Sequence, residues 1–237
     1  MDKKVIVITG ASGGIGRELA TFLNTEKHHL ILHSFHHEIP IDISDNITFV
    51  KADLTKSIEI DRMVELILSK FGKVDVLINN SGISRNAVTW KTTDADWEET
   101  LLVNLTAPFK LCRAFIPAMR KQNGGSIINI TSVVAQTGVV GTAAYAASKA
   151  GLIGLTKTMA KELAPNNIGV NALSLGYFEK GMISNVPEDL KNEIVAQIPM
   201  KKLGSVQTIC KTISWLIDDE TSYVTGQVIN LNGGLHS

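Results

Sequence analysis

The chain has 237 residues, and its 23 Lys and Arg balance 23 Asp and Glu, so the formal net charge at pH 7 is zero. This balance argues against a nucleic-acid-binding protein, which carries a basic surplus, and no block of like charge suggests a binding tail. Hydrophobic residues make up 44% of the chain, enough for one α/β domain with a large core. Cys112 and Cys210 form no CxxC motif or disulfide framework, which favours reduced thiols.

The N-terminal residues lead directly into an apolar strand, without the features of a signal peptide. No unbroken apolar run approaches the roughly 18 residues of a membrane span. We therefore expect a cytoplasmic globule with no membrane or nucleic-acid partner.

Short apolar runs alternate along the chain with segments of helical periodicity. Strands are expected at residues 5–9, 30–33, 48–52, 74–79, 126–131, 168–174 and 227–231. Helices are expected at residues 17–23, 58–71, 94–120, 143–163 and 209–217. The segment between the second and third strands contains Pro40 and leaves little room for a full helix. This alternation predicts a parallel sheet with helices on both faces, and the absence of a repeat or linker favours one domain over residues 1–237.

A glycine-rich turn joins the first strand to the first helix. Its sequence is Thr9-Gly10-Ala11-Ser12-Gly13-Gly14-Ile15-Gly16. Glycine permits positive φ and a close approach of backbone amides to a phosphate, and the helix N-terminus adds free N–H groups and partial positive charge. The spacing is Gly-x-x-x-Gly-x-Gly instead of the common Gly-x-Gly-x-x-Gly. Such turns also occur for packing alone, but the strand before and the helix after favour a nucleotide site.

Tyr145 and Lys149 lie four residues apart in an expected helix, so their side chains share one face. Tyrosine titrates at a pKa of about 10, and a neighbouring cation favours the phenolate and lowers that pKa. Such a pair could exchange a proton with an alcohol oxygen. The spacing alone is weak evidence, because it arises by chance in many helices.

Together with other motifs, these residues resemble the short-chain dehydrogenase/reductase family. The shared motifs are Thr9-Gly10-x-x-x-Gly14-x-Gly16, Asn79-Asn80-Ser81-Gly82, Asn104, Ser132, Tyr145-x-x-x-Lys149, Tyr223-Val-Thr-Gly226-Gln and Asn232-Gly233-Gly234. The resemblance covers essentially the whole chain. Within the family the chain most resembles the 3-oxoacyl-(acyl-carrier-protein) reductases, through the less specific segments 124–132 and 202–204.

The resemblance implies a single-domain, Rossmann-type doubly wound α/β fold with about seven parallel strands and a dinucleotide over the carboxyl edge. It implies that Tyr145 is the general acid in reduction and that Lys149 lowers its pKa and holds the nicotinamide ribose. Ser132 would hydrogen-bond the substrate carbonyl, and Asn104 would position a water that links Lys149 to solvent. Taken singly, Ser132 could be a strand-end turn residue and Asn104 an ordinary helix residue.

The resemblance also implies the cofactor contacts. They are Gly10, Ser12, Gly13, Gly14, Ile15, Gly16, Ser34, Asp53, Leu54, Asn80, Ser81, Gly82, Tyr145, Lys149, Gly176 and Phe178. Asp53 would accept a hydrogen bond from the adenine amino group, and Asn79 and Gly82 would line the adenine ribose and the middle of the cofactor.

Cofactor choice depends on the end of the second strand, where an acidic residue would bind the ribose 2′-hydroxyl of NAD. Ser34 stands there, so the NAD signature is missing. Gly13 stands where many NADP-dependent relatives carry an arginine. Arg17, His36 and His37 could still meet a 2′-phosphate, so we expect NADP(H), with NAD(H) as the alternative.

Five of the six histidines lie between His28 and His37. Imidazole is a common metal ligand, but no carboxylate or cysteine completes a recognisable spacing, and we expect no metal. A solvated loop and a contact with the cofactor phosphate remain as interpretations.

The segment after the sixth strand departs from the family pattern. Leu175-Gly176 stands where relatives usually have Pro-Gly, and Lys180 follows where a threonine would contact the nicotinamide carboxamide. Lys180 could replace that contact or face the substrate. Residues 177–200 are expected to form a mobile lid.

We expect NADPH-dependent reduction of a ketone to a secondary alcohol, with a 3-oxoacyl thioester, possibly on an acyl carrier protein, as substrate. Alternatives are another small alcohol or ketone, such as a sugar, polyol or steroid, and a non-catalytic dinucleotide-binding regulator. The arginines that relatives present to a carrier correspond to Ser126 and Asn166, although Arg113, Arg120 and Lys121 lie nearby in sequence. By resemblance, helices 94–120 and 143–163 pair between subunits of a homotetramer.

Overall fold

Seven parallel strands form one sheet in the computed structural model, which describes residues 3–41, 44–181, 183 and 186–237. The strands are β1 (Lys4–Ile8), β2 (His28–Ser34), β3 (Ile47–Lys51), β4 (Val76–Asn79), β5 (Gly125–Ser132), β6 (Ile168–Leu175) and β7 (Val228–Leu231). Their order is β3-β2-β1-β4-β5-β6-β7. The chain winds outward in both directions from β1, which pairs with β2 and with β4. The predicted doubly wound parallel sheet is thereby confirmed.

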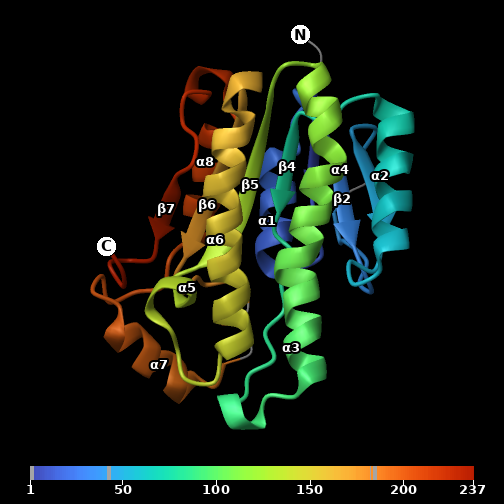
Figure 1. Cartoon of the computed structure of the whole chain (residues 1–237). Coiled ribbons are helices and arrows are strands. Elements are labelled where there is room, and N and C mark those ends of the chain that lie inside the picture. Colours follow the sequence, from blue (N-terminus) through green and yellow to red (C-terminus); the bar gives the residue numbers. More distant parts are fainter. Residues whose placement is uncertain (1–2, 42–43, 182, 184–185) are drawn as a thin grey trace.

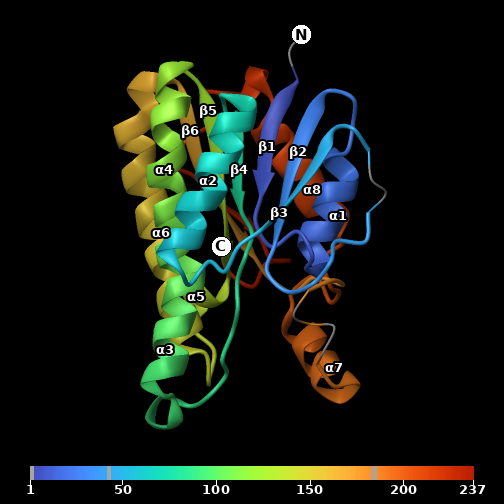
Figure 2. The same ribbon diagram turned by 90° about the vertical axis from the view of Figure 1, so that its right-hand side faces the viewer.

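Helices cover both faces of the sheet, as Figures 1 and 2 show. One layer is α1 (Gly14–Leu23) and α8 (Val206–Leu216); the other is α2 (Ser57–Phe71), α4 (Ala107–Lys121) and α6 (Ala143–Leu163). Each layer encloses its own apolar core against the sheet. On α2 the buried residues are Ile60, Met63, Val64 and Ile67, the three- and four-residue spacing of an amphipathic helix.

The expected helix 94–120 is one continuous rod with an irregular middle. It consists of α3 (Asp94–Leu101), the π-helical turn η2 (Leu102–Thr106) and α4. Thr93 caps the start, where its hydroxyl accepts from the Asp96 N–H at 3.1 Å. The π turn places Asn104 fully inside the protein.

This rod, Asp94–Lys121, is long and apolar enough to cross a membrane by length and composition alone. Length and composition are weak evidence for a membrane span, because core helices share them, and Leu111 and Phe115 on this rod are buried in the core. The rod is not an unbroken apolar run, because Asn104, Lys110 and Arg113 interrupt it, so it does not contradict the expectation that no such run has the length of a span.

Other differences from the expected elements are local. Helix α1 begins at Gly14, three residues before the expected Arg17, because the glycine turn itself starts the helix. The short helices α5 (Val134–Thr137) and α7 (Glu188–Gln197) were not predicted, nor were the 3₁₀ turns η1 (Thr89–Lys91), η3 (Ala164–Asn166) and η5 (Asp219–Thr221). The described residues between β2 and β3 contain no helix, as expected.

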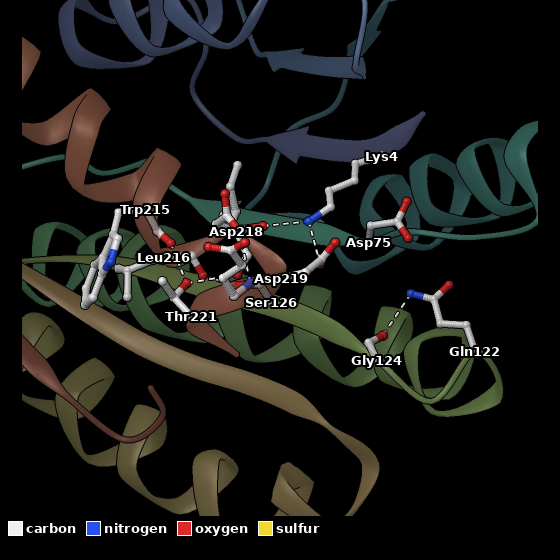
Figure 3. A network of polar contacts seen from close by, with 12 residues as sticks. Lys4, Asp75, Gln122, Gly124, Ser126, Trp215, Leu216, Asp218, Asp219 and Thr221 are labelled. Carbon is white, nitrogen blue, oxygen red and sulfur yellow. Dashed lines mark hydrogen bonds and ion pairs between the residues drawn. The ribbon is translucent and has the colours of Figure 1, made fainter. Parts of the chain in front are cut away.

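The amino-terminal edge of the sheet carries a polar network, shown in Figure 3. The Lys4 ammonium donates to the Ile217 carbonyl and to the Asp219 carboxylate, both at 2.7 Å. The Asp75 carboxylate accepts from the Val5 N–H at 2.7 Å. These bonds tie β1 to the segments before β4 and after α8, and they lie opposite the carboxyl edge, where ligands of doubly wound folds bind.

Candidate active site

A cavity of about 740 Å³ lies at the carboxyl edge of the sheet. It lies beside β1 and β4, the neighbouring strands at which the strand order changes direction. Its walls come from loops after β1, β2, β3 and β4, with Lys180 and Gly181 from the segment after β6. The predicted cofactor residues that line it are Gly10, Ser12, Gly13, Gly14, Ile15, Gly16, Asp53, Leu54, Asn80, Ser81 and Gly82.

Five other predicted cofactor residues are absent from this lining: Ser34, Tyr145, Lys149, Gly176 and Phe178. Ser34 is buried, while its neighbours His33 and Phe35 face the cavity. Phe178 packs into the apolar core, and a Cβ on Gly204 would lie 2.6 Å from its ring. The structure therefore places Phe178 as a core residue.

The glycines of the turn allow close approaches that other residues would prevent. A Cβ on Gly16 would lie 2.3 Å from the Gly10 carbonyl oxygen. A Cβ on Gly14 would lie 2.8 Å from the backbone nitrogen of Gly181. Gly10 has a φ of +64°, a conformation that glycine adopts without strain. This compact turn, open to the cavity at the start of α1, fits a diphosphate.

His33 holds the glycine turn from the neighbouring strand. Its Nδ1 accepts from the Gly10 N–H at 3.2 Å, and its Nε2 lies 2.9 Å from the Ala52 carbonyl oxygen. Because a carbonyl can only accept, Nε2 carries the proton and the ring is neutral. Burial lowers the pKa of His33, which agrees with this tautomer.

The histidine cluster is therefore not a solvated loop. His28, His29 and His33 belong to β2, and only His36 and His37 lie in the exposed bend that follows. No group of three or more potential metal ligands occurs among the described residues. Sequence reasoning missed the structural role of His33, because nothing in the sequence shows that its ring faces Gly10 and Ala52.

A second set of bonds joins the turn to the loop after β4. The Asn80 side-chain amide donates to the carbonyls of Thr9 at 2.9 Å and Gly10 at 3.1 Å. The Thr9 hydroxyl accepts from the N–H groups of Asn80 and Ser81, both at 3.0 Å. The carboxylate of Asp53, on the opposite wall, accepts from the Thr55 hydroxyl at 2.7 Å.

The four predicted catalytic residues come from three adjoining elements. Ser132 ends β5, Tyr145 and Lys149 lie on α6, and Asn104 lies in η2. A Cβ on Gly82 would lie 3.3 Å from the Lys149 ammonium and 3.5 Å from the Asn104 side-chain oxygen. Since Gly82 also lines the cavity, these two side chains lie directly behind its wall.

Lys149 is buried, and its ammonium donates to the Ile130 carbonyl at 2.8 Å. Desolvation lowers its pKa to about 8. Its nitrogen lies 5.8 Å from the centroid of the Tyr145 ring, on the same face of α6. Lys149 could thus gain and lose a proton near neutral pH.

The expected lowering of the Tyr145 pKa is not seen in this structure. Burial raises that pKa, and Tyr177 nearby raises it further, whereas a hydrogen bond with Ser132 lowers it. The Lys149 ammonium donates to the Ile130 carbonyl and does not offset the effect of burial on the Tyr145 pKa. A neutral phenol is the form required of a proton donor.

The Asn104 side chain is fully engaged with protein groups. Its oxygen accepts from the Ile83 N–H at 2.9 Å, and its amide donates to the Ile83 carbonyl at 2.9 Å and to the Ser148 hydroxyl at 3.1 Å. Ser148 in turn donates to the Tyr145 carbonyl at 2.7 Å. Asn104 thus joins η2 to α6 between the tyrosine and the lysine, and a role in holding water remains a prediction. Ser148 was not predicted.

The expected lid, residues 177–200, starts as a fixed segment. The Glu179 N–H donates to the Gly204 carbonyl at 3.1 Å, and its carboxylate accepts from the Ser205 hydroxyl at 3.2 Å and the Val206 N–H at 3.3 Å. Helix α7 within it has no buried residue. Residues 182, 184 and 185 of the expected lid lie outside the described residues.

Comparison with known proteins agrees with this arrangement. Residues 10–236 match the family model described as enoyl-(acyl carrier protein) reductase. The 3-oxoacyl-[acyl-carrier-protein] reductase of Staphylococcus epidermidis is 36% identical over 98% of this chain and 99% of that protein. The Thermotoga maritima protein of the same name is 37% identical over 99% and 98%. Nodulation protein G of a Rhizobium species is 37% identical over 97% and 95%.

The matches to these relatives cover nearly the full length of this chain and of each relative. The glycine turn, the carboxyl end of β5 and α6 all fall within them. The family resemblance and the enzyme class predicted from the sequence are thereby confirmed. The chain belongs to the short-chain dehydrogenase/reductase family and is an NAD(P)-dependent oxidoreductase that acts on alcohol or ketone groups.

Proposed function

We propose that the enzyme reduces the ketone of a 3-oxoacyl thioester to a secondary alcohol with NADPH. The observation that carries this proposal is the full-length similarity to several 3-oxoacyl-[acyl-carrier-protein] reductases. The site chemistry supports it, because Ser132 and Tyr145 present two hydroxyl groups that could polarise one carbonyl oxygen.

The proton chemistry follows from the contacts of these residues. The Ser132 oxygen accepts from the Val134 N–H at 3.2 Å, and the Ser132 hydroxyl also bonds with Tyr145. A substrate oxygen would replace Tyr145 as the acceptor of the Ser132 proton. Tyr145 would give its proton to that oxygen as negative charge develops. Lys149 would restore the proton, and Asn104 would hold the π turn against α6. The bound dinucleotide supplies the hydride.

A preference for NADPH is supported by the charges around the adenine end of the cavity. The carboxylates among the lining residues are Asp53 and Glu99, and neither belongs to the end of β2, where a carboxylate would repel a 2′-phosphate. Arg17, His36 and His37 line the same cavity and can donate to a phosphate.

Two rivals act on other substrates. The matching family model carries an enoyl reductase name, which would mean reduction of a carbon–carbon double bond. The other rival is a small alcohol or ketone that is not a thioester. Both reductions develop negative charge on a carbonyl oxygen, so the hydroxyl pair at Ser132 and Tyr145 is compatible with either. The full-length similarity to proteins named 3-oxoacyl reductases favours the ketone.

The test is the loss of reduced-nicotinamide absorbance with a short 3-oxoacyl thioester, the matching enoyl thioester and a panel of small ketones, each with NADPH and NADH. We expect turnover of the 3-oxoacyl thioester with NADPH and none of the enoyl thioester. Exclusive turnover of a small ketone, or a preference for NADH, would contradict the corresponding part of the proposal.

We also propose the acyl carrier protein as substrate carrier, a cytoplasmic location and a homotetramer. Ser126 lies at the start of β5 and Asn166 precedes β6, which places both at the sheet edge opposite Tyr145, so a carrier would have to contact other residues near the site. A lower KM for carrier-bound than for free thioester would support it, and equal KM values would speak against it.

A further inference from the structure

Lys180 is a cation at the mouth of the cofactor cavity that the family pattern does not supply. We propose that it binds the cofactor diphosphate, and that Glu18 competes for it in the free enzyme. This inference rests on the proposed use of a nicotinamide dinucleotide and names a further residue of that site.

The glycine turn offers backbone amides but no charge. Residues 10–16 contain no ionisable side chain, whereas a diphosphate carries negative charge on both of its phosphates. The helix N-terminus supplies only a partial positive charge. A lysine beside this turn would therefore meet an anion that the turn alone neutralises incompletely.

The backbone holds Lys180 at that place. Phe178 is buried, and the Glu179 N–H and carboxylate are bound to Gly204, Ser205 and Val206. The next residues then lie on the turn, since a Cβ on Gly14 would be 3.5 Å from the Lys180 Cβ. Lys180 lines the cavity together with Gly14 and Ile15.

Lys180 pairs weakly with Glu18 in this structure, so an anionic ligand could replace Glu18 as its partner. Its ammonium lies 3.7 Å from a Glu18 carboxylate oxygen, beyond a normal hydrogen bond, and 46% of the Lys180 side chain is exposed. Exposed pairs of this kind are weak. Glu18 lies one helical turn after Gly14, so its charge would otherwise repel an anion bound at the turn.

The alternatives are that Lys180 contacts the nicotinamide carboxamide or faces the substrate. A carboxamide contact predicts an unchanged Kd for 2′-phospho-ADP-ribose, which keeps the diphosphate and lacks the nicotinamide, whereas a diphosphate contact predicts a higher Kd. The diphosphate and substrate assignments differ in which ligand binds more weakly when the charge is lost. A diphosphate contact predicts weaker binding of the whole dinucleotide and no change for adenosine 2′-monophosphate, which lacks the diphosphate. A substrate contact predicts a change in the KM of the thioester alone.

The experiment is calorimetric titration of Lys180→Gln, Glu18→Gln and the double variant with NADPH, with 2′-phospho-ADP-ribose and with adenosine 2′-monophosphate. We expect Lys180→Gln to raise the NADPH Kd about tenfold, or about 1.4 kcal/mol, and Glu18→Gln to lower it. The NADPH Kd of the double variant should lie between those of the two single variants, because the loss of Glu18 also removes its repulsion of the anion, and the monophosphate Kd should not move. Lys191→Gln is the control, because Lys191 also pairs with a glutamate, Glu188 at 3.5 Å, but lies on α7.

A higher NADPH Kd in one single variant and a lower NADPH Kd in the other cannot both come from a general loss of structure. Unfolding midpoints check that each variant is folded. An unchanged Kd for NADPH or for 2′-phospho-ADP-ribose in Lys180→Gln, or an equal loss for NADPH and the monophosphate, overturns this inference. Absence of NADPH binding by the unaltered enzyme would instead overturn the proposed function.

Discussion

At the scale of single residues, the Tyr145 hydroxyl is the group whose removal should affect turnover most. Tyr145→Phe keeps the ring but removes the proton donor, so we expect turnover to fall by about 10²- to 10⁴-fold. NADPH affinity should stay within about twofold, since the lost hydroxyl binds the substrate oxygen in our proposal. Steady-state kinetics and calorimetry measure both quantities.

The control for this variant is Tyr223→Phe, because Tyr223 is fully exposed at the surface. It should leave turnover unchanged. Retained turnover in Tyr145→Phe would show that another group donates the proton and would remove Tyr145 from the catalytic set.

The positions of Tyr145, Lys149, Ser132 and Asn104 could be predicted because motif spacing is a property of the sequence. Their protonation could not, because it depends on burial. The phenol and the ammonium are both desolvated by packing from distant elements, which raises the pKa of Tyr145 and lowers that of Lys149. The roles assigned to these residues stay predictions until the variants are measured.

His33 should make the stability of the enzyme depend on pH. Burial lowers its pKa below the ordinary value of 6.5, so the unfolded chain binds this proton more readily than the folded protein. The free energy of unfolding should therefore fall as pH drops through 6.5 toward the folded pKa. The pKa values of His28 and His29 are also lowered by burial and act in the same direction.

Chemical denaturation between about pH 7.5 and 5.5 tests this linkage. His33→Gln can still donate to Ala52 and accept from Gly10 but does not titrate, so we expect a shallower loss of stability at low pH. His36→Gln is the control, because His36 is exposed. An unchanged slope in His33→Gln would mean that other groups cause the dependence.

At the scale of elements, the glycine turn is the segment with the least steric freedom. Gly16→Ala would place a Cβ 2.3 Å from the Gly10 carbonyl oxygen, so the turn must shift. We expect the NADPH Kd to rise by at least about tenfold, or about 1.4 kcal/mol. Calorimetric titration measures this change.

Gly13→Ala is the matched control in the same turn. Gly13 has a φ of −72°, which any residue can adopt. The atom nearest to an added Cβ would be the Gly10 carbonyl oxygen at 3.4 Å, an ordinary van der Waals contact. The NADPH Kd should therefore stay within about twofold. Equal losses in both variants would contradict the steric argument.

The elements themselves were predictable to different degrees. Helix α2 follows from its apolar spacing, and its start and end lie within one residue of the prediction. The π turn at Asn104 could not be predicted, because it is a single turn of i→i+5 hydrogen bonds inside an otherwise α-helical segment and no residue type marks it. Helix α7 was missed because it has only the three large apolar residues Leu190, Ile194 and Val195, none of them buried, which is too few to separate a short helix from a loop.

At the scale of the whole molecule, the parallel sheet could be predicted because short, largely apolar strands alternate with helices along most of the chain. The position of the cavity follows from the strand order, since β2 and β4 lie on opposite sides of β1 and the connections at their carboxyl ends lead away in opposite directions. The association of subunits depends on surfaces whose partners the sequence does not show.

The expected homotetramer leads to the last prediction. Helices α4 and α6 lie on one face of the sheet (Figure 2), and Phe109 on α4 is 42% exposed. If these helices pair between subunits as the family resemblance implies, Phe109→Glu should bury a charge in the interface and dissociate the tetramer. Light scattering after size exclusion measures the mass. Leu66→Glu, on exposed α2 of the same face, is the control and should leave the mass unchanged. A monomeric unaltered protein, or a tetramer insensitive to Phe109→Glu, would place the subunit contacts elsewhere or exclude them.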